Sequence, residues 1–90
     1  MKKYNVVLSE QFKKEFRKLD RYTQKMIRGW IDKNLIGTSN HRIHGKNLTA
    51  NRSGQWRYRI AGYHLICQIE DDKLIILALT VGYQREIYSK

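Results

Sequence analysis

The chain has 90 residues, of which 41% are hydrophobic and 11% aromatic. This length predicts a single domain over residues 1–90, and this apolar content excludes a disordered chain. Lys and Arg number 18 against 8 Asp and Glu, a formal net charge of +10 that opposes compaction and predicts an anionic partner, either nucleic acid, a membrane surface or an acidic protein.

Targeting and membrane signals are weak in this sequence. The apolar run from Tyr4 to Leu8 is too short for a secretory signal, and no run approaches the roughly 20 residues of a membrane span. The lone Cys67 allows no internal disulfide, and its apolar neighbours Leu65 and Ile66 predict a buried packing residue. We therefore expect a cytoplasmic protein with no membrane partner.

The positive charge is concentrated in one part of the chain. No acidic residue occurs between Asp32 and Glu70, whereas six basic residues and all three histidines lie there. The six are Lys33, Arg42, Lys46, Arg52, Arg57 and Arg59. A segment of one sign favours nucleic-acid binding over the alternative, a basic surface that serves only solubility.

The first half of the chain predicts a strand and a helical hairpin. Residues 4–8 are typical of a short strand, and Ser9 is a suitable N-cap for a following helix. Apolar residues then recur at helical spacing through residues 10–36, and we assign them to the core. They are Phe12, Phe16, Leu19, Met26, Ile27, Trp30, Ile31 and Leu35. Asp20 marks the link between two helices, and Gly37 stands where a helix-terminating glycine belongs.

The second half predicts strands. Residues 37–53 are rich in Gly, Asn, Ser and Thr, as in a loop, and strands follow at 55–60, 63–69 and 74–81. The last strand is apolar on both faces, which indicates a central position. The order β-α-α-β-β-β predicts an α+β fold, an antiparallel sheet with the N-terminal α-hairpin packed on one face.

A cluster of basic side chains is predicted on the first hairpin. Arg57 and Arg59 are two apart on a strand, so they share a face about 7 Å from each other. A turn centred on Ala61-Gly62 pairs Arg59 with His64, which adds a third group to that face. Burying three such groups is costly, so we expect a solvent-accessible face that binds phosphate. The alternative is a polar outer face that protects the sheet from aggregation.

Several motifs together resemble the RelE/ParE toxin superfamily, and the RelE/StbE branch most closely. They are Gly54-x-Trp56-Arg57-Tyr58-Arg59-Ile60, Gly62-Tyr63-His64-Leu65-Ile66-Cys67-x-Ile69, Leu74-Ile75-Ile76-Leu77 and Val81-Gly82-Tyr83-Gln84-Arg85-Glu86-Ile87-Tyr88. The Lys46-Asn47-Leu48 loop and the β-α-α opening also fit, so the resemblance covers essentially the whole chain.

The resemblance implies the toxin of a type II toxin–antitoxin system, an endoribonuclease that cleaves messenger RNA in the ribosomal A site and so inhibits translation. Cleavage in this family proceeds by attack of the ribose 2′-hydroxyl on the adjacent phosphate, without metal or other cofactor. The partners implied are an acidic antitoxin, the ribosome and messenger RNA. The catalytic residues carried over are Arg57, Arg59, His64, Arg85 and Tyr88, and RNA contacts are expected at Arg42, Lys46, Arg52 and Gln84.

Two departures from the family pattern affect the expected chemistry. His64 stands where most relatives have arginine, and Gln84 stands where many have the arginine of Gly-His-Arg. Arginine is a poor proton carrier because its pKa lies above about 12, so proton transfer is assigned mainly to His64 and Tyr88. Tyr88 orients or deprotonates the 2′-hydroxyl, and His64 or Arg85 protonates the leaving 5′-oxygen.

Two other functions fit the same residues. A ParE-like inhibitor of DNA gyrase shares the fold without cleaving RNA, and a non-catalytic RNA- or DNA-binding module predicts salt-dependent affinity without cleavage. His41 and His44 are three residues apart, but no cysteine or carboxylate lies near them in the sequence. We therefore predict no metal site.

Overall fold

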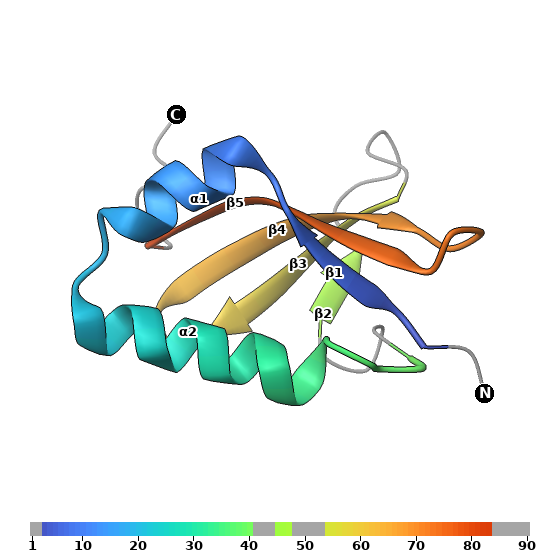
Figure 1. Ribbon diagram of the computed structural model, residues 1–90, viewed down its shortest axis with the longest axis horizontal. Coiled ribbons are helices and arrows are strands. Elements are labelled where there is room, and N and C mark those ends of the chain that lie inside the picture. The colour runs from blue at the N-terminus through green and yellow to red at the C-terminus, as the bar shows by residue number, and fades with distance from the viewer. Residues whose placement is uncertain (1–2, 41–44, 48–53, 84–90) are drawn as a thin grey trace.

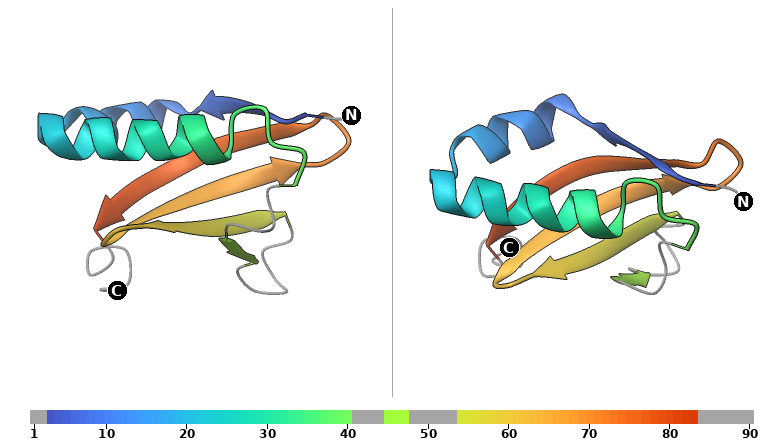
Figure 2. Two further views of the ribbon diagram at one scale, coloured as in Figure 1. Left: turned by 90° about the horizontal axis from the view of Figure 1, so that it is seen from below. Right: turned by 60° about the horizontal axis from the view of Figure 1, so that its bottom comes forward.

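The computed structural model describes residues 3–40, 45–47 and 54–83. The elements in chain order are β1 (Asn5–Leu8), α1 (Glu10–Arg17), α2 (Arg21–Asn34), β2 (Gly45–Asn47), β3 (Gln55–Ile60), β4 (Tyr63–Glu70) and β5 (Ile75–Tyr83). The strands form one sheet in the order β1-β5-β4-β3-β2, and both helices cover the same face of it (Figures 1 and 2). The predicted α+β fold with a helical hairpin on one face is confirmed.

The ends of the helices follow their local sequence. The Ser9 side chain accepts a hydrogen bond from the backbone N–H of Phe12 at 3.0 Å, which satisfies one open donor at the start of α1. Asp20 is extended at the start of α2, and its carboxylate accepts a hydrogen bond from the Thr23 hydroxyl. Gly37 follows α2 with φ +78°, a left-handed conformation that glycine adopts without steric cost.

The sheet is antiparallel from β2 to β5, and β1 adds a parallel edge. β3 and β4 pair with Arg59 opposite His64 and Ile60 opposite Tyr63, the predicted register. β5 lies between β4 and β1, which confirms its predicted central position. β1 runs parallel to β5, so the predicted all-antiparallel arrangement does not hold at this edge, because an apolar strand carries no signal of its direction. β2 is a further strand, within the segment predicted as loop.

The core lies between the sheet and the two helices. Ile27, Leu35, Tyr58 and Leu65 have no exposed surface, and the rings of Trp30 on α2 and Tyr58 on β3 lie 5.7 Å apart. Tyr58 and Ile60 are therefore on the helix-covered face, as their alternation with the arginines of β3 predicts.

Helix α1 also completes the outer edge of β5. β1 pairs with β5 only at residues 75–78, which leaves the rest of this edge to another partner. A Glu15 carboxylate oxygen accepts hydrogen bonds from the Thr80 hydroxyl at 2.6 Å and from the Val81 backbone N–H at 3.0 Å. One side chain on α1 thus supplies acceptors where the edge strand ends.

Candidate nucleic-acid interface

The arginines of β3 form the basic part of the site. Arg59 is exposed and Arg57 is half-buried, while Tyr58 between them is fully buried on the opposite face. The backbone of Lys46 in β2 pairs with Arg57, so three basic positions occupy the two neighbouring strands at this side of the sheet. A row of guanidinium groups on a strand can bind phosphate by charge-assisted, bidentate hydrogen bonds.

His64 differs from the prediction. It pairs with Arg59 and lies opposite Gly82 of β5, but its side chain is completely buried. The expectation that all three groups lie on a solvent-accessible face is therefore wrong for His64, although it holds for Arg59. Burial lowers the pKa of His64, and the positive charges of Arg57 and Arg59 lower it further. At neutral pH this imidazole is uncharged.

The buried imidazole predicts a loss of stability in acid. In the unfolded chain His64 titrates near 6.5, and in the folded protein its pKa lies lower, so below pH 6.5 the unfolded state binds more protons. The contribution of neutral His64 to the free energy of unfolding is complete above pH 6.5 and declines as the pH falls toward the folded-state pKa. We expect urea unfolding between pH 7.5 and about 5 to show a stability slope that becomes shallower in His64→Gln. An identical slope of stability against pH in the variant would show that His64 titrates alike in the folded and unfolded states.

Five of the other predicted site residues lie outside the described residues, namely Arg42, Arg52, Gln84, Arg85 and Tyr88. The same holds for His41 and His44. Of Lys46 only the backbone is described. In residues 3–40, 45–47 and 54–83, no three His, Cys, Asp or Glu side chains gather as a metal site requires.

The predicted packing role of Cys67 agrees with the structure. The side chain is fully buried within the core, and burial raises the pKa of its thiol. A buried thiol of this kind is not a nucleophile at neutral pH.

An aromatic pair lies at the end of the sheet next to the β3–β4 turn, on the face opposite to that of the arginines. Tyr63 of β4 pairs with Tyr83 of β5, and their rings meet edge to face with centroids 5.2 Å apart. Tyr83 keeps 49% of its surface exposed. Because it shares the face of Ile60, this pair does not belong to the basic site.

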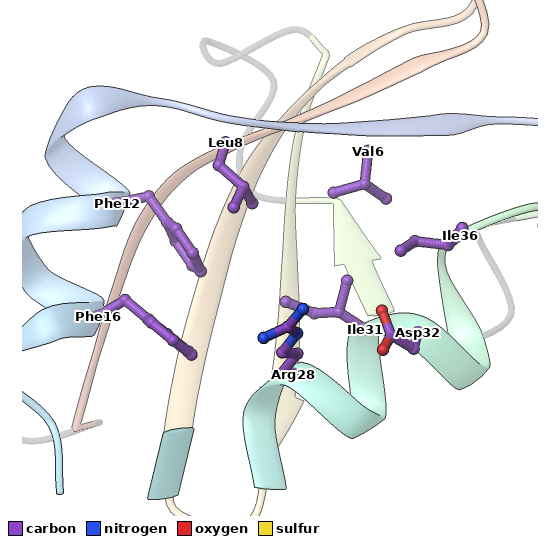
Figure 3. A pocket seen from close by; sticks show the side chains of 8 residues that line it. All are labelled: Val6, Leu8, Phe12, Phe16, Arg28, Ile31, Asp32 and Ile36. Carbon is purple, nitrogen blue, oxygen red and sulfur yellow. The ribbon is translucent and has the colours of Figure 1, made fainter. Parts of the chain in front are cut away.

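A second feature is an apolar groove on the helix side of the sheet. It has a volume of about 410 Å³ and lies between β1, α1 and α2 (Figure 3). Apolar side chains line most of it, and Arg28 and Asp32 stand together on the α2 side. The lining residues are Val6, Leu8, Phe12, Phe16, Arg28, Ile31, Asp32 and Ile36. Leu8 and Ile36 are also exposed, at 39% and 52%. Exposed apolar side chains around a groove are typical of a protein-binding surface.

Neither α1 nor α2 in the described part of the chain has the length and apolar content needed to cross a membrane.

The family is established by comparison with known proteins. The model of the family described as the ParE toxin of the type II toxin–antitoxin system parDE matches residues 6–88. The chain therefore belongs to this toxin family, within the RelE/ParE superfamily that the sequence motifs indicate. No curated protein sequence gives a significant match.

Solved structures of RelE toxins share the fold. In the RelBE2 toxin–antitoxin complex from Mycobacterium tuberculosis, the match has a TM-score of 0.81 at 20% identity and covers 93% of this chain and 94% of the other. The isolated Escherichia coli RelE toxin matches with a TM-score of 0.70 at 21% identity, and the match covers 96% of this chain and 92% of the other. The RelE–RelB complex from Pyrococcus horikoshii matches with a TM-score of 0.68 at 15% identity, and the match covers 92% of this chain and 97% of the other. At these identities the likeness establishes the fold alone.

Proposed function

We propose that this toxin is an endoribonuclease that cleaves messenger RNA in the ribosomal A site. The observation that carries the proposal is the row formed by Arg57 and exposed Arg59 on β3. Attack of a ribose 2′-hydroxyl on the neighbouring phosphate builds negative charge on the phosphoryl oxygens. Guanidinium groups held on a strand can stabilise that charge without rearranging during the reaction. A toxin that only blocks gyrase has no need of such a row.

The remaining catalytic groups follow from the chemistry of the reaction. Tyr88 orients or deprotonates the 2′-hydroxyl. Because His64 is buried and uncharged at neutral pH, it is poorly suited to donate a proton. We therefore assign protonation of the leaving 5′-oxygen to Arg85, whose guanidinium is a weak acid but a stronger one than the alcohol that forms. His64 becomes a positioning residue behind Arg59, its cross-strand partner. Arg42, Lys46, Arg52 and Gln84 are proposed RNA contacts, and the reaction as proposed uses no metal.

Gyrase inhibition is the second candidate, because the matching family model carries the ParE name. The two functions are separated by translating a defined messenger RNA in vitro with the purified toxin and mapping cuts by primer extension. The expected result is discrete cuts at A-site codons that require ribosomes. Intact RNA with continued translation, together with loss of DNA supercoiling by gyrase, would replace the nuclease proposal with the gyrase one.

We also propose that an acidic antitoxin occupies the groove between β1, α1 and α2. Two of the three compared structures, those from Mycobacterium tuberculosis and Pyrococcus horikoshii, are complexes of a toxin with its antitoxin, which motivates a partner of this kind. The helices beside the groove carry an excess of exposed basic side chains, at Lys13, Lys14, Arg17, Lys18, Arg21, Lys25, Arg28 and Lys33. An amphipathic acidic segment could place apolar side chains in the groove while its carboxylates face these cations.

A charge placed in the groove is expected to weaken antitoxin binding. Leu8→Glu puts a carboxylate on an apolar wall, and we expect at least about a 30-fold rise in Kd, because loss of a central interface contact costs about 2 kcal/mol or more. Tyr22→Glu is the matched control, since Tyr22 is 76% exposed on α2 and does not line the groove. Isothermal titration with the antitoxin encoded beside the toxin gene measures both. Equal affinity for Leu8→Glu and wild type would exclude the groove.

A further inference from the structure

Two glutamines lie on the outer face of the sheet, the face opposite to the helices that also carries the arginines of β3. Gln55 precedes Arg57 by two residues on this strand, so the two side chains share a face and are about 7 Å apart along it. Gln68 of β4 pairs directly with Gln55, and directly opposed residues share a face. The two amides therefore belong to one row of the outer face, next to the row that contains Arg57.

The amide of Gln68 is held close to the start of β3. A Cβ atom at Gly54 would lie only 2.6 Å from Gln68 Nε2, so the end of this side chain lies against the glycine. The backbone N–H of Ile69 donates a hydrogen bond to the Gly54 carbonyl oxygen at 2.6 Å, which fixes the two segments to each other at this point. The Gln68 side chain thus reaches from β4 to the start of β3, the strand that carries Gln55.

The hydrogen-bonding capacity of these amides is not used by the fold. Gln55 and Gln68 are half-buried, and among the residues that the structure describes neither amide takes part in a hydrogen bond. A half-buried polar group costs free energy unless water or a ligand satisfies it. Each amide has two donors and an acceptor, whereas a guanidinium has donors alone. This row can therefore bind groups that the neighbouring arginines cannot.

The same row continues as apolar surface. Leu77 of β5 pairs with Gln68, and Val7 of β1 pairs with Leu77. Leu77 is half-buried and Val7 is 44% exposed. A nucleobase combines the same two properties, because its edges form hydrogen bonds and its flat faces pack on apolar side chains. The row thus suits a base better than a second phosphate, which requires cations.

We propose that Gln55 and Gln68 recognise one nucleobase of the RNA strand whose phosphate is bound by Arg57. This inference rests on the proposed function, because it takes the ligand to be single-stranded RNA. Contacts between arginine and phosphate position the strand without reading its sequence, whereas contacts with the edge of a base depend on its identity. The expected base is adenine, since a glutamine amide can accept a hydrogen bond from N6 and donate one to N7.

The test is equilibrium binding of the full chain to short 2′-O-methyl RNAs, measured by fluorescence anisotropy. The RNAs are oligouridine and the same chain with a central adenine, guanine or cytosine, and the methyl group removes the attacking hydroxyl. Wild type should bind the adenine RNA roughly 5- to 150-fold more tightly than oligouridine, which corresponds to about 1–3 kcal/mol of discrimination. Gln55→Leu and Gln68→Leu should each reduce this preference, and the double variant should abolish it. All three should bind oligouridine within about twofold of wild type, a change of about 0.4 kcal/mol.

Two controls separate base recognition from other effects. Gln11→Leu removes an exposed glutamine from α1 and should keep the full preference for adenine. Arg57→Ala should weaken binding of all four RNAs alike. The inference is overturned if wild type binds the four RNAs with equal affinity, or if the preference survives in the double glutamine variant. Thermal unfolding monitors the fold, and Gln68→Met replaces Gln68→Leu if that variant does not fold.

The outcome for the amide row is distinct from the outcome for the proposed function. Binding is measured without reaction, so a toxin that fails to cleave messenger RNA on ribosomes would contradict the nuclease and leave the base preference readable. Unchanged RNA affinity in Arg57→Ala would contradict the arginine row and not the amides.

Discussion

Replacing Arg59 with alanine is expected to reduce the rate of ribosome-dependent cleavage by roughly 100- to 1,000-fold, the usual cost of removing one preorganised group that stabilises transition-state charge. Arg59 is the exposed member of the β3 row, and its alternation with buried Tyr58 and Ile60 fixes its side chain on the outer face. Single-turnover cleavage of messenger RNA on programmed ribosomes measures the effect directly, because product release then does not limit the rate.

Two variants control for the loss of charge. Arg17→Ala removes another exposed arginine, on α1, and should leave cleavage nearly unchanged. Arg59→Lys keeps the charge but loses the planar pair of donors, so an intermediate rate is expected. If Arg59→Ala and Arg17→Ala slow cleavage to the same small extent, the arginine row acts only through net charge and is not the catalytic surface.

Ile27→Ala should reduce the free energy of unfolding by about 2–5 kcal/mol, because it removes buried methyl groups and leaves a cavity. Ile27 lies in the middle of α2, has no exposed surface, and belongs to the core between the helices and the sheet. In a domain of this size each 1 kcal/mol corresponds to roughly 4–8 °C in Tm. Urea denaturation followed by circular dichroism measures the change.

The same substitution at Ile36 provides the comparison. Ile36 follows α2 and is 52% exposed, so Ile36→Ala should change the free energy of unfolding by no more than about 0.5 kcal/mol. A loss of similar size at both positions would mean that the α2 packing described here does not provide the main stabilisation.

The first β-hairpin was predictable because its signals are local. Alternation of Arg57, Tyr58 and Arg59 identifies the strand and its faces, and the Ala61-Gly62 turn sets the pairing of Arg59 with His64. A two-residue turn leaves no freedom of register, so the contact follows from the sequence. The helix boundaries were predictable for the same reason, because Ser9 caps the start of α1 and Gly37 directly follows the end of α2.

Features that depend on distant residues were not predictable. Glu15 is separated by 65 residues from Thr80, and nothing in either local sequence indicates their hydrogen bond. The parallel pairing of β1 with β5 likewise has no turn to define it. The burial of His64 is not determined by its local sequence, whereas its face follows from alternation along the strand. The predicted face was therefore correct and the predicted exposure was not.

The candidate site likewise contains one feature that the sequence predicts and one that it does not. Arg57 and Arg59 could be placed on one face from spacing alone, whereas the burial of His64 on that face could not be predicted. The superfamily was recognisable because its motifs are distributed in order along the chain, and the family match over residues 6–88 agrees.

The pairing of β1 with β5 also has a consequence for synthesis of the protein. β1 is made first among the elements, yet its partner residues 75–78 are made only after both helices and three other strands. Until then the nascent chain has no central strand on which β1 and α1 can dock, and the Glu15 bonds cannot form. Contacts of such high sequence separation form late in folding. A toxin proposed to act on ribosomes therefore stays incomplete for most of the time that a ribosome is translating it.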